Sequence, residues 1–390
     1  MMRIGFFSWE TKNSVPVGGV AEVVSYLAEA LAKMGHEVHV FTRIGAGQQE
    51  HEIINGVHEH RCISPPSDDF IEYMDHVCDS MVSCFHYVEQ QYGKFDVLHG
   101  HDWHVVNALA NIKHNKGYDF AWTCHSTEWG RNGNNYYTNW FSDRVRHREW
   151  LGGYLCKVVT AVSYTMKDEL YNQYGVPRSK VRVTYNGINP DEFNGKIDPG
   201  RIKEQYGIYP LDPVVLFMGR MCHQKGPDLL VEAIPDVLSM RGDTQFVFAG
   251  GGDDMIRHVN GRSHWLGVGD NVHTVGYVHS QEKYNLFKSC DMVCIPSRNE
   301  PFGIITLEAW ASAKPVVATN VGGPREIIEN FYNGIKVYQS PDSIAWGIKY
   351  LLGDPTGESI RQMGLNARKS VRQYTWKQTA KRYLDIYDEI

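Results

Sequence analysis

Short apolar runs alternate with helix-period segments along nearly the whole chain, and this alternation limits the folds that the chain can adopt. In the first half, runs rich in Val, Phe and Ile predict the strands Arg3–Trp9, Glu37–Ile44, Asp96–His101, Phe120–His125, Lys157–Ser163 and Val181–Tyr185. Segments between them predict the helices Val20–Met34, Val105–Lys113 and Tyr164–Tyr174. Because most of the runs lack polar alternation, they are typical of a parallel sheet covered on both faces. The pattern predicts a doubly wound α/β domain.

The alternation breaks around Asn189–Pro213, where Gly and Pro residues predict a linker, and it then restarts. The second half predicts the strands Val214–Met218, Gln245–Ala249, Val272–Val275, Met292–Pro296, Pro315–Thr319 and Ile335–Tyr338. Its predicted helices are Pro227–Met240, Glu282–Lys288, Ile304–Ala313, Arg325–Asn330, Ser343–Leu352 and a terminal one from Trp376 to Ile390. Two α/β domains in series are therefore expected, with ligands at the carboxyl ends of the strands and in the cleft between the two sheets.

Length and charge agree with two soluble domains. The chain has 390 residues, of which 42% are hydrophobic and 22% charged, and its formal net charge is -6. A slightly acidic protein is not expected to bind nucleic acid or anionic lipid broadly. The apolar run within Met1–Glu10 is too short for a signal peptide, and no window reaches the ~18 apolar residues of a spanning helix. No stable membrane insertion is expected.

The cysteines and histidines do not form a metal-binding pattern. The eight cysteines are scattered without a C-x-x-C pair, which favours reduced thiols and a cytoplasmic location. Neither an H-E-x-x-H motif nor a D-x-D triplet occurs, although His99, His101 and His104 are close in sequence. We therefore expect no metal at the site.

Three turns of the first half could carry chemistry. Gly18 and Gly19 precede a predicted helix, where backbone N–H groups attract anions, although a Gly pair taken alone is better explained by a tight turn. The turn is not G-x-G-x-x-G, so a dinucleotide cofactor is disfavoured and no cofactor is expected. Asp102 and His125 follow two adjacent predicted strands. They could face a ligand, or Asp102 could simply cap the next helix.

Two turns of the second half carry charged residues. Arg220 and Lys225 follow the first strand and could both reach a pyrophosphate, the alternative being two solvated cations on a loop. Glu300 and Glu308 flank the start of the helix predicted from Ile304. Carboxylates accept hydrogen bonds from hydroxyls, so this turn suits a sugar or a ribose better than a phosphate.

Together, these motifs resemble those of a known family. Glu300 and Glu308 form the E-x7-E motif of retaining nucleotide-sugar glycosyltransferases of GT-B fold (family 4, group 1), within the segment Glu-Pro-Phe-Gly-Ile-Ile-Thr-Leu-Glu-Ala-Trp-Ala. The Gly pair at 18–19, the Gly-Arg…Lys-Gly stretch at 219–226 and the Gly-Gly-x-x-Glu segment at 322–326 also match, in family order. The His-Asp-Trp-His at 101–104 is similar to glycogen and starch synthases.

The resemblance implies a domain plan. It gives an N-terminal acceptor-binding domain (1–190), a hinge (191–212), a C-terminal nucleotide-sugar-binding domain (213–372) and a terminal helix (373–390) that crosses back to the first domain. The two Rossmann-like domains are expected to face each other across the cleft. The apolar face of that helix, with Ala380 and Tyr383, needs a surface to cover.

The resemblance also implies roles for individual residues. His125, Glu300, Arg220 and Lys225 would be catalytic, with the two cations holding the leaving diphosphate without a metal. Donor contacts would come from the following residues: Gly18, Gly19, Tyr277, Val278, Phe302, Gly303, Ile304, Ile305 and Glu308. Glu308 would bind the ribose, while Tyr277 or Val278 would flank the base. Asp102 and Arg131 would contact the acceptor.

The resemblance implies transfer of a hexose, with glucose as the first candidate, to a sugar or glucan acceptor with retention of anomeric configuration. The donor would be UDP-glucose or ADP-glucose. A small, phosphorylated or lipid-linked acceptor is the main alternative, because four arginines lie with three aromatic residues in the first half: Arg131, Arg144, Arg146 and Arg148 with Trp140, Phe141 and Trp150. A solvated helix face explains the same residues. A GT-B nucleotide-sugar epimerase and a non-catalytic sugar-nucleotide sensor are the remaining alternatives; donor turnover without acceptor would reveal the epimerase.

Overall fold

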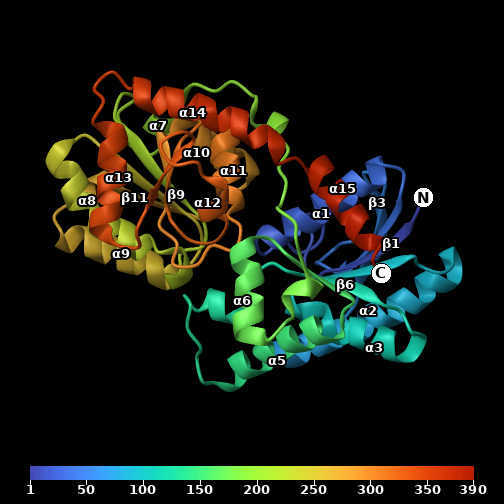
Figure 1. Cartoon of the computed structure of the whole chain (residues 1–390). Coiled ribbons are helices and arrows are strands. Elements are labelled where there is room, and N and C mark those ends of the chain that lie inside the picture. Colours follow the sequence, from blue (N-terminus) through green and yellow to red (C-terminus); the bar gives the residue numbers. More distant parts are fainter. The chain divides into compact units, whose positions relative to one another are not determined.

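The chain divides into two units, each built around its own sheet. The computed structural model describes residues 1–390. Unit 1 comprises Met1–Trp129, Asn135–Gly187 and Trp376–Ile390, and unit 2 comprises Gly130–Asn134 and Ile188–Thr375. Both units are α/β, with parallel sheets (Figure 1).

The sheet of unit 1 has eight strands in the order β3-β4-β2-β1-β5-β6-β7-β8. All neighbours pair in parallel except β3 and β4, which form an antiparallel edge. The strands are β1 (Arg3–Phe7), β2 (Glu37–Arg43), β3 (His51–Ile54), β4 (Val57–Cys62), β5 (Val97–His101), β6 (Phe120–Cys124), β7 (Val158–Ala161) and β8 (Val181–Val183). The central strands β1 and β5 are almost fully buried, as their apolar runs predict.

Helices cover both faces of the first sheet. They are α1 (Gly19–Lys33), α2 (Phe70–Tyr92), α3 (Val106–Lys116), α5 (Trp140–Leu155), α6 (Tyr164–Tyr174) and α15 (Trp376–Tyr387). The short helix α4 (Glu128–Arg131) begins in unit 1 and ends in the segment Gly130–Asn134 of unit 2. Side chains of α2, α3, α5 and α6 build one core with strand residues such as Phe41 and Trp122. Helices α1 and α15, at opposite ends of the sequence, lie side by side over the sheet (Figure 1), and Tyr26 stacks on Trp376 with ring centroids 5.8 Å apart.

Helix α15 is anchored to unit 1 by two buried tyrosines. The hydroxyl of Tyr387 lies 2.8 Å from Nδ1 of His99, and that of Tyr383 lies 3.1 Å from Oγ1 of Thr123. Both tyrosines are almost completely buried. The apolar side of the terminal helix therefore packs on the strands of the first sheet.

Unit 2 has a parallel sheet of six strands in the order β11-β10-β9-β12-β13-β14. The strands are β9 (Val214–Met218), β10 (Gln245–Ala249), β11 (Val272–Gly276), β12 (Met292–Ile295), β13 (Val316–Thr319) and β14 (Gly334–Val337). Its helices are α7 (Pro199–Gln205), α8 (Pro227–Met240), α9 (Asp253–Trp265), α10 (Ser280–Ser289), α11 (Ile304–Ala311), α12 (Gly322–Ile327), α13 (Pro341–Leu352) and α14 (Glu358–Ser370). Helices α8, α9 and α13 share one core with the strands.

Several elements differ from the sequence prediction. The range 191–212, predicted as a linker, lies inside unit 2 and forms a 3-10 turn at Pro190–Phe193 and helix α7. Asp198 caps α7 by accepting from the N–H of Arg201 at 3.3 Å. The helix predicted at Arg325–Asn330 begins earlier, at Gly322. Other elements were not predicted: β3, β4, α2, α4, α5, α9 and α14.

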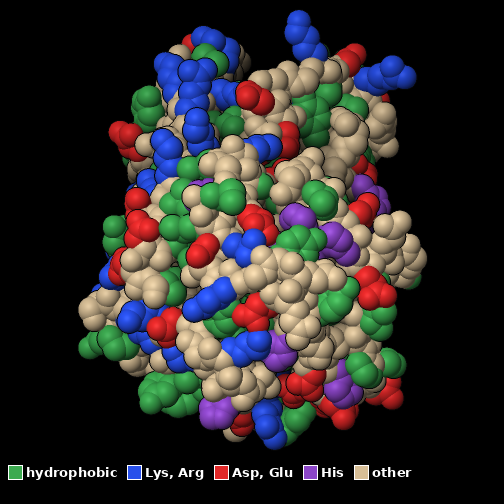
Figure 2. Space-filling model, turned by 90° about the vertical axis from the view of Figure 1, so that its right-hand side faces the viewer, with side chains coloured by type: hydrophobic (Ala, Val, Ile, Leu, Met, Phe, Trp, Pro, Cys, Tyr) green, Lys and Arg blue, Asp and Glu red, His purple; other side chains and the backbone are tan.

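The surface carries charges of both signs. On the face drawn in Figure 2, acidic and basic side chains are interspersed, with a group of Lys and Arg near its upper left edge. None of the helices has the length and apolar composition that crossing a bilayer requires. The longest helix, α2, includes Glu72, Asp75, Asp79 and Glu89.

Candidate active site

The strand order of unit 2 reverses between β9 and β12, and the turns after these two strands carry the predicted donor residues. β9 is the first strand of this sheet and pairs with β10 on one side and β12 on the other. Arg220 and Lys225 lie in the turn after β9, and Glu300 lies in the turn after β12. Ligands of open α/β sheets bind where the order reverses, at the carboxyl ends of the strands. The topology therefore brings these three residues to the position where a ligand is expected.

Lys225 and Glu300 form an ion pair. Nζ of Lys225 lies 2.8 Å from each carboxylate oxygen of Glu300, and Oγ of Ser297 donates to Oε2 at 2.9 Å. The Glu300 side chain is only 7% accessible and that of Lys225 is 21% accessible. The carboxylate is therefore held by one cation and one hydroxyl.

Arg220 is the predicted cation that has no acidic partner. Its Nη2 donates to Oε1 of Gln224, a neutral acceptor, at 2.9 Å, and the residue is exposed. Because Glu300 already offsets the charge of Lys225, the positive charge open to an anionic ligand at this turn comes from Arg220.

Two residues that the sequence analysis missed tie the two turns together. The backbone carbonyl of Gln224 accepts from the N–H of Arg298 at 2.8 Å. The Arg298 guanidinium donates to both oxygens of Asp228, at 2.8 and 2.6 Å. Burial opposes ionisation of Asp228, but the hydrogen bonds and charge of Arg298 outweigh it, so the pKa of Asp228 lies below its ordinary value. This fork fixes the Glu300 turn against the start of α8.

Backbone packing around the Glu300 turn requires glycine at two positions. Gly303 has φ +81° and precedes α11, which has no side-chain cap. A Cβ on Gly323 would lie 2.0 Å from the carbonyl oxygen of the buried Phe302. The predicted donor residues Ile304 and Ile305 form the first turn of α11. The Gly-Gly segment thus supports the predicted donor loop by close approach of two backbones.

Glu308 pairs with a residue that was not predicted. Nζ of Lys283, on α10, lies 2.5 Å from Oε1 of the buried Glu308. Tyr277, after β11, is 68% exposed, whereas its neighbour Val278 is buried. An exposed ring at the carboxyl end of a strand is free to stack on a planar group, and of the two predicted base contacts only Tyr277 has this property.

In unit 1, an acidic side chain occupies the Gly18 turn. Oε2 of Glu10 accepts from the N–H groups of Val17 at 2.5 Å and Gly18 at 2.8 Å. Burial raises the pKa of Glu10, although these two hydrogen bonds oppose the shift. The prediction that the Gly18 N–H is open to an anion is therefore wrong in this structure. Gly19 starts α1 and is exposed.

Asp102 does not cap the helix that follows it. Its side chain makes no capping hydrogen bond, and its φ is +60°. Instead Oδ1 accepts from the backbone N–H of His125 at 2.7 Å. The structure thus corrects the capping interpretation and brings Asp102 and His125 together, as their positions after neighbouring strands predict.

His125 belongs to a row of buried imidazoles. Its Nε2 lies 3.0 Å from Nδ1 of His101, whose Nε2 has no hydrogen-bond partner. Burial lowers the pKa of His125 and of His99 to about 3. At neutral pH these side chains are uncharged, so His125 can offer a neutral donor or acceptor to a hydroxyl.

Arg131 and Asp102 are assigned to different units. Arg131 closes the short helix α4 and belongs to the segment Gly130–Asn134 of unit 2, whereas Asp102 belongs to unit 1. The structure therefore does not bring the two predicted acceptor residues into one unit. No group of three or more His, Cys, Asp or Glu side chains is arranged to hold a metal ion.

Comparison with known proteins adds to this geometry. The family described as Glycosyltransferase Family 4 matches residues 17–192, and Glycosyl transferases group 1 matches residues 199–370. An uncharacterized glycosyltransferase of Methanocaldococcus jannaschii is 37% identical over 99% of this chain and 98% of its own length. A glycogen synthase of Mycobacterium tuberculosis is 25% identical over 99% of this chain and 94% of its own.

Solved structures show the same fold. Sucrose-phosphate synthase from Thermosynechococcus elongatus has a TM-score of 0.81 at 22% identity, covering 100% of this chain and 99% of that one. The catalytic domain of starch synthase IV from Arabidopsis thaliana, bound to ADP and acarbose, has a TM-score of 0.77 at 17% identity, with 99% of both chains covered. The chain therefore belongs to the GT-B glycosyltransferases with family 4 and group 1 domains, as its motifs indicate.

Proposed function

We propose that this glycosyltransferase transfers a hexose, with glucose the first candidate, from a nucleoside-diphosphate sugar to a sugar or glucan acceptor with retention of anomeric configuration. The observation that carries the proposal is the arrangement at the strand reversal of unit 2. There Arg220 offers a positive charge while Glu300, held by Lys225, presents a carboxylate. A cation beside a carboxylate that can accept hydrogen bonds from hydroxyl groups suits a ligand that joins a diphosphate to a sugar.

In the reaction that we propose, the bond between the anomeric carbon and the diphosphate breaks, and a bond to an acceptor hydroxyl forms as that hydroxyl loses its proton. Negative charge builds on the departing diphosphate, and Arg220 is suited to stabilise it. Lys225 would also help to stabilise the diphosphate, so that no metal is needed, and its ion pair would hold Glu300 in place. Glu300 and the start of α11 would hold the donor sugar, with Glu308 on the ribose and Tyr277 on the base.

Unit 1 would supply the acceptor contacts and His125. Asp102 and the neutral imidazole of His125 can both form hydrogen bonds with hydroxyl groups. Glu10, which accepts from the N–H groups of Val17 and Gly18, adds a further carboxylate. Carboxylates and neutral imidazoles suit a carbohydrate better than a phosphorylated acceptor. For this reason a glucan or oligosaccharide is the acceptor that we favour. A cytoplasmic location stays a prediction.

A second candidate is transfer to a small phosphorylated acceptor. A D-inositol 3-phosphate glycosyltransferase of Xylanimonas cellulosilytica is 30% identical over 56% of this chain. Under this alternative Arg131, Arg144 and Arg146 would be candidates for the acceptor phosphate, whereas Arg148 is buried and donates to the carboxylate of Asp75.

A donor-by-acceptor activity matrix tests the proposal. UDP-, ADP- and GDP-glucose and GDP-mannose are each combined with glycogen, maltose, glucose 6-phosphate, inositol 3-phosphate and a lipid acceptor. Transfer to glycogen or maltose supports the favoured reading, and transfer only to a phosphorylated acceptor supports the second. Turnover of donor without acceptor would indicate an epimerase. Binding of the donor without any turnover would indicate a sensor. The Arg220→Ala variant serves as the control for background hydrolysis of the donor.

A further inference from the structure

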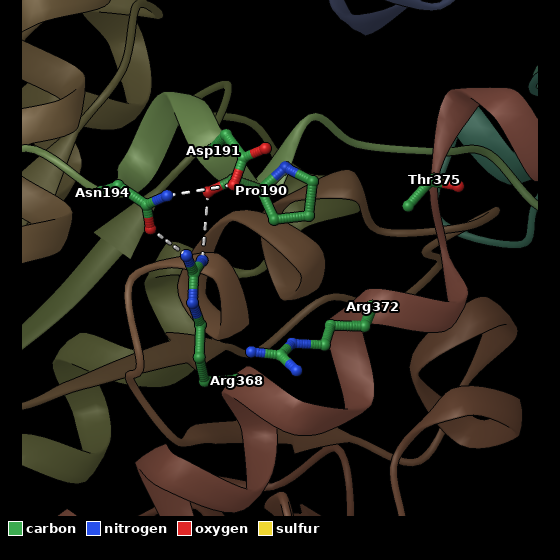
Figure 3. A pocket seen from close by; sticks show the side chains of 6 residues that line it. All are labelled: Pro190, Asp191, Asn194, Arg368, Arg372 and Thr375. Atoms are coloured by element: carbon green, nitrogen blue, oxygen red, sulfur yellow. Dashed lines mark hydrogen bonds between the residues drawn. The ribbon is translucent and has the colours of Figure 1, made fainter.

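A cavity in unit 2 is lined by none of the predicted site residues. It has a volume of 320 Å³ and is lined by Pro190, Asp191, Asn194, Arg368, Arg372 and Thr375 (Figure 3). These residues come from the first turn of unit 2 after Ile188 and from the end of α14 and the segment that follows it. The cavity shares no residue with the turns that carry Arg220 and Glu300.

Arg368 is a half-buried cation whose hydrogen bonds all go to neutral acceptors. Its Nη1 donates to the carbonyl of Pro190 at 3.1 Å and to that of Ala311, and its Nη2 donates to Oδ1 of Asn194. Burial lowers the pKa of Arg368, Asp191 opposes this shift, and Arg372 adds to it. A guanidinium remains protonated in proteins. A partly desolvated positive charge therefore stands here without a hydrogen-bonded anion.

Arg372 adds a second guanidinium to the same cavity. It is exposed, makes no hydrogen bond or ion pair in the structure, and extends toward Arg368 (Figure 3). The arginines Arg262 and Arg298 of this unit behave differently, since each donates to both oxygens of a carboxylate. Two like charges facing one cavity repel each other unless an anion lies between them.

The acidic side chain of the cavity does not cancel this charge. Asp191 accepts a hydrogen bond from Nδ2 of Asn194 at 3.0 Å, and no ion pair joins it to either arginine. Two guanidinium groups and one carboxylate leave the lining with a net positive charge. Arginine forks bond phosphate oxygens in pairs, which makes phosphate the anion that this lining fits best.

We propose that this cavity binds a phosphate dianion, either free or as the phosphate of a small monoester, between Arg368 and Arg372. Bound there, the anion would hold residues 190–194 to residues 368–375, near the two ends of the segment Ile188–Thr375. This site is separate from the donor site and goes beyond the transfer reaction proposed above.

Isothermal titration calorimetry on the full chain tests the proposal, with inorganic phosphate and glycerol 3-phosphate as probes at constant ionic strength. The native chain should show saturable binding. Arg372→Ala should weaken it by about tenfold or more, as expected for loss of a charge-assisted hydrogen bond. Lys369→Ala is the matched control, because it removes an exposed positive charge from the adjoining turn of α14 without altering the cavity. Its Kd should stay within about twofold of the native value.

A third variant separates this site from the donor site. Arg220→Ala should retain the phosphate binding that Arg372→Ala weakens if the anion lies between Arg368 and Arg372. The proposal is wrong if the native chain shows no saturable binding, if Arg372→Ala binds as tightly as the native chain, or if only Arg220→Ala loses binding. Thermal melts confirm that each variant is folded. Tighter binding of inorganic phosphate than of glycerol 3-phosphate assigns the site to the free anion, and the reverse order assigns it to a monoester.

Discussion

The pair formed by Lys225 and Glu300 makes a quantitative prediction about stability. Replacing Lys225 by Met keeps a chain of similar shape but leaves the Glu300 carboxylate, only 7% accessible, with the hydroxyl of Ser297 as its remaining side-chain partner. Removing one partner of a buried pair costs roughly 3–5 kcal/mol. Since the Lys225 side chain is 21% accessible, water can replace part of the lost interaction, and we expect a loss of about 2–3 kcal/mol.

The assay is thermal unfolding of a set of matched variants. For a domain of this size, each 1 kcal/mol lowers Tm by roughly 2–4 °C, so Lys225→Met should lower Tm by about 4–12 °C. The double variant Lys225→Met/Glu300→Gln removes the buried charge as well and should recover most of the loss. A double-mutant cycle should therefore give a coupling of about 2 kcal/mol.

The control is an exposed pair of the same unit. Lys349 and Asp236 lie 2.6 Å apart, with side chains 28% and 49% accessible. Exposed pairs contribute about 0–1 kcal/mol, so Lys349→Met should change Tm by no more than a few degrees. If Lys225→Met lowered Tm no more than Lys349→Met does, or if the double variant were no more stable than Lys225→Met, the reasoning about the charge of Glu300 would be refuted.

Further predictions concern catalysis, metal and pH. Arg220→Ala should lower kcat by about 10²–10³-fold, because the contact of Arg220 with the diphosphate tightens as negative charge builds there. Glu308→Gln should instead raise KM more than it lowers kcat. Steady-state kinetics of the folded variants checks both predictions, and full kcat in Arg220→Ala would contradict the first. Activity should survive dialysis against EDTA, and loss of turnover that Mg²⁺ or Mn²⁺ restores would show that a metal takes part. Burial lowers the pKa of His99 and His125 from 6.5 to about 3, so below pH 6.5 the unfolded chain binds protons that the folded chain does not. Each histidine should therefore cost about 2 kcal/mol of stability at pH 5 relative to pH 7, seen as a falling Tm, and an equal Tm at the two values would contradict it.

The strands of unit 2 show what local sequence can predict. Val214–Met218 and Gln245–Ala249 form strands with the predicted bounds, because a short run rich in Val and Phe and bounded by turn residues favours a buried strand. By contrast β4 was missed, since it holds His58, Glu59, His60 and Arg61, most of them buried. Polar residues enter a strand interior only when other parts of the fold supply their partners, and no local pattern reveals that.

The site shows the same division. The sequence identified Arg220, Lys225 and Glu300 but not the contact between the last two, which are separated by 75 positions. The Arg298–Asp228 fork spans 70 positions and carries no motif of its own. Glu10 was missed because its acceptance of the Gly18 N–H depends on how the loop after β1 turns back. Local spacing in the sequence therefore predicts which residues lie in the site. Their hydrogen-bond and ion-pair partners depend on the topology of the fold.

The two sheets place different charges at the same topological position. In both units the order reverses next to the first strand, at β1 and β5 in unit 1 and at β9 and β12 in unit 2. The turns of unit 1 hold the carboxylates of Glu10 and Asp102 on the backbone N–H groups of Val17, Gly18 and His125, so these three amides already have a partner. The turns of unit 2 instead pair their carboxylate with Lys225 and leave Arg220 without an acidic partner. We therefore expect an anion to favour unit 2 and a neutral polyol to favour unit 1, in keeping with the transfer that we propose from a nucleoside-diphosphate sugar to a carbohydrate hydroxyl.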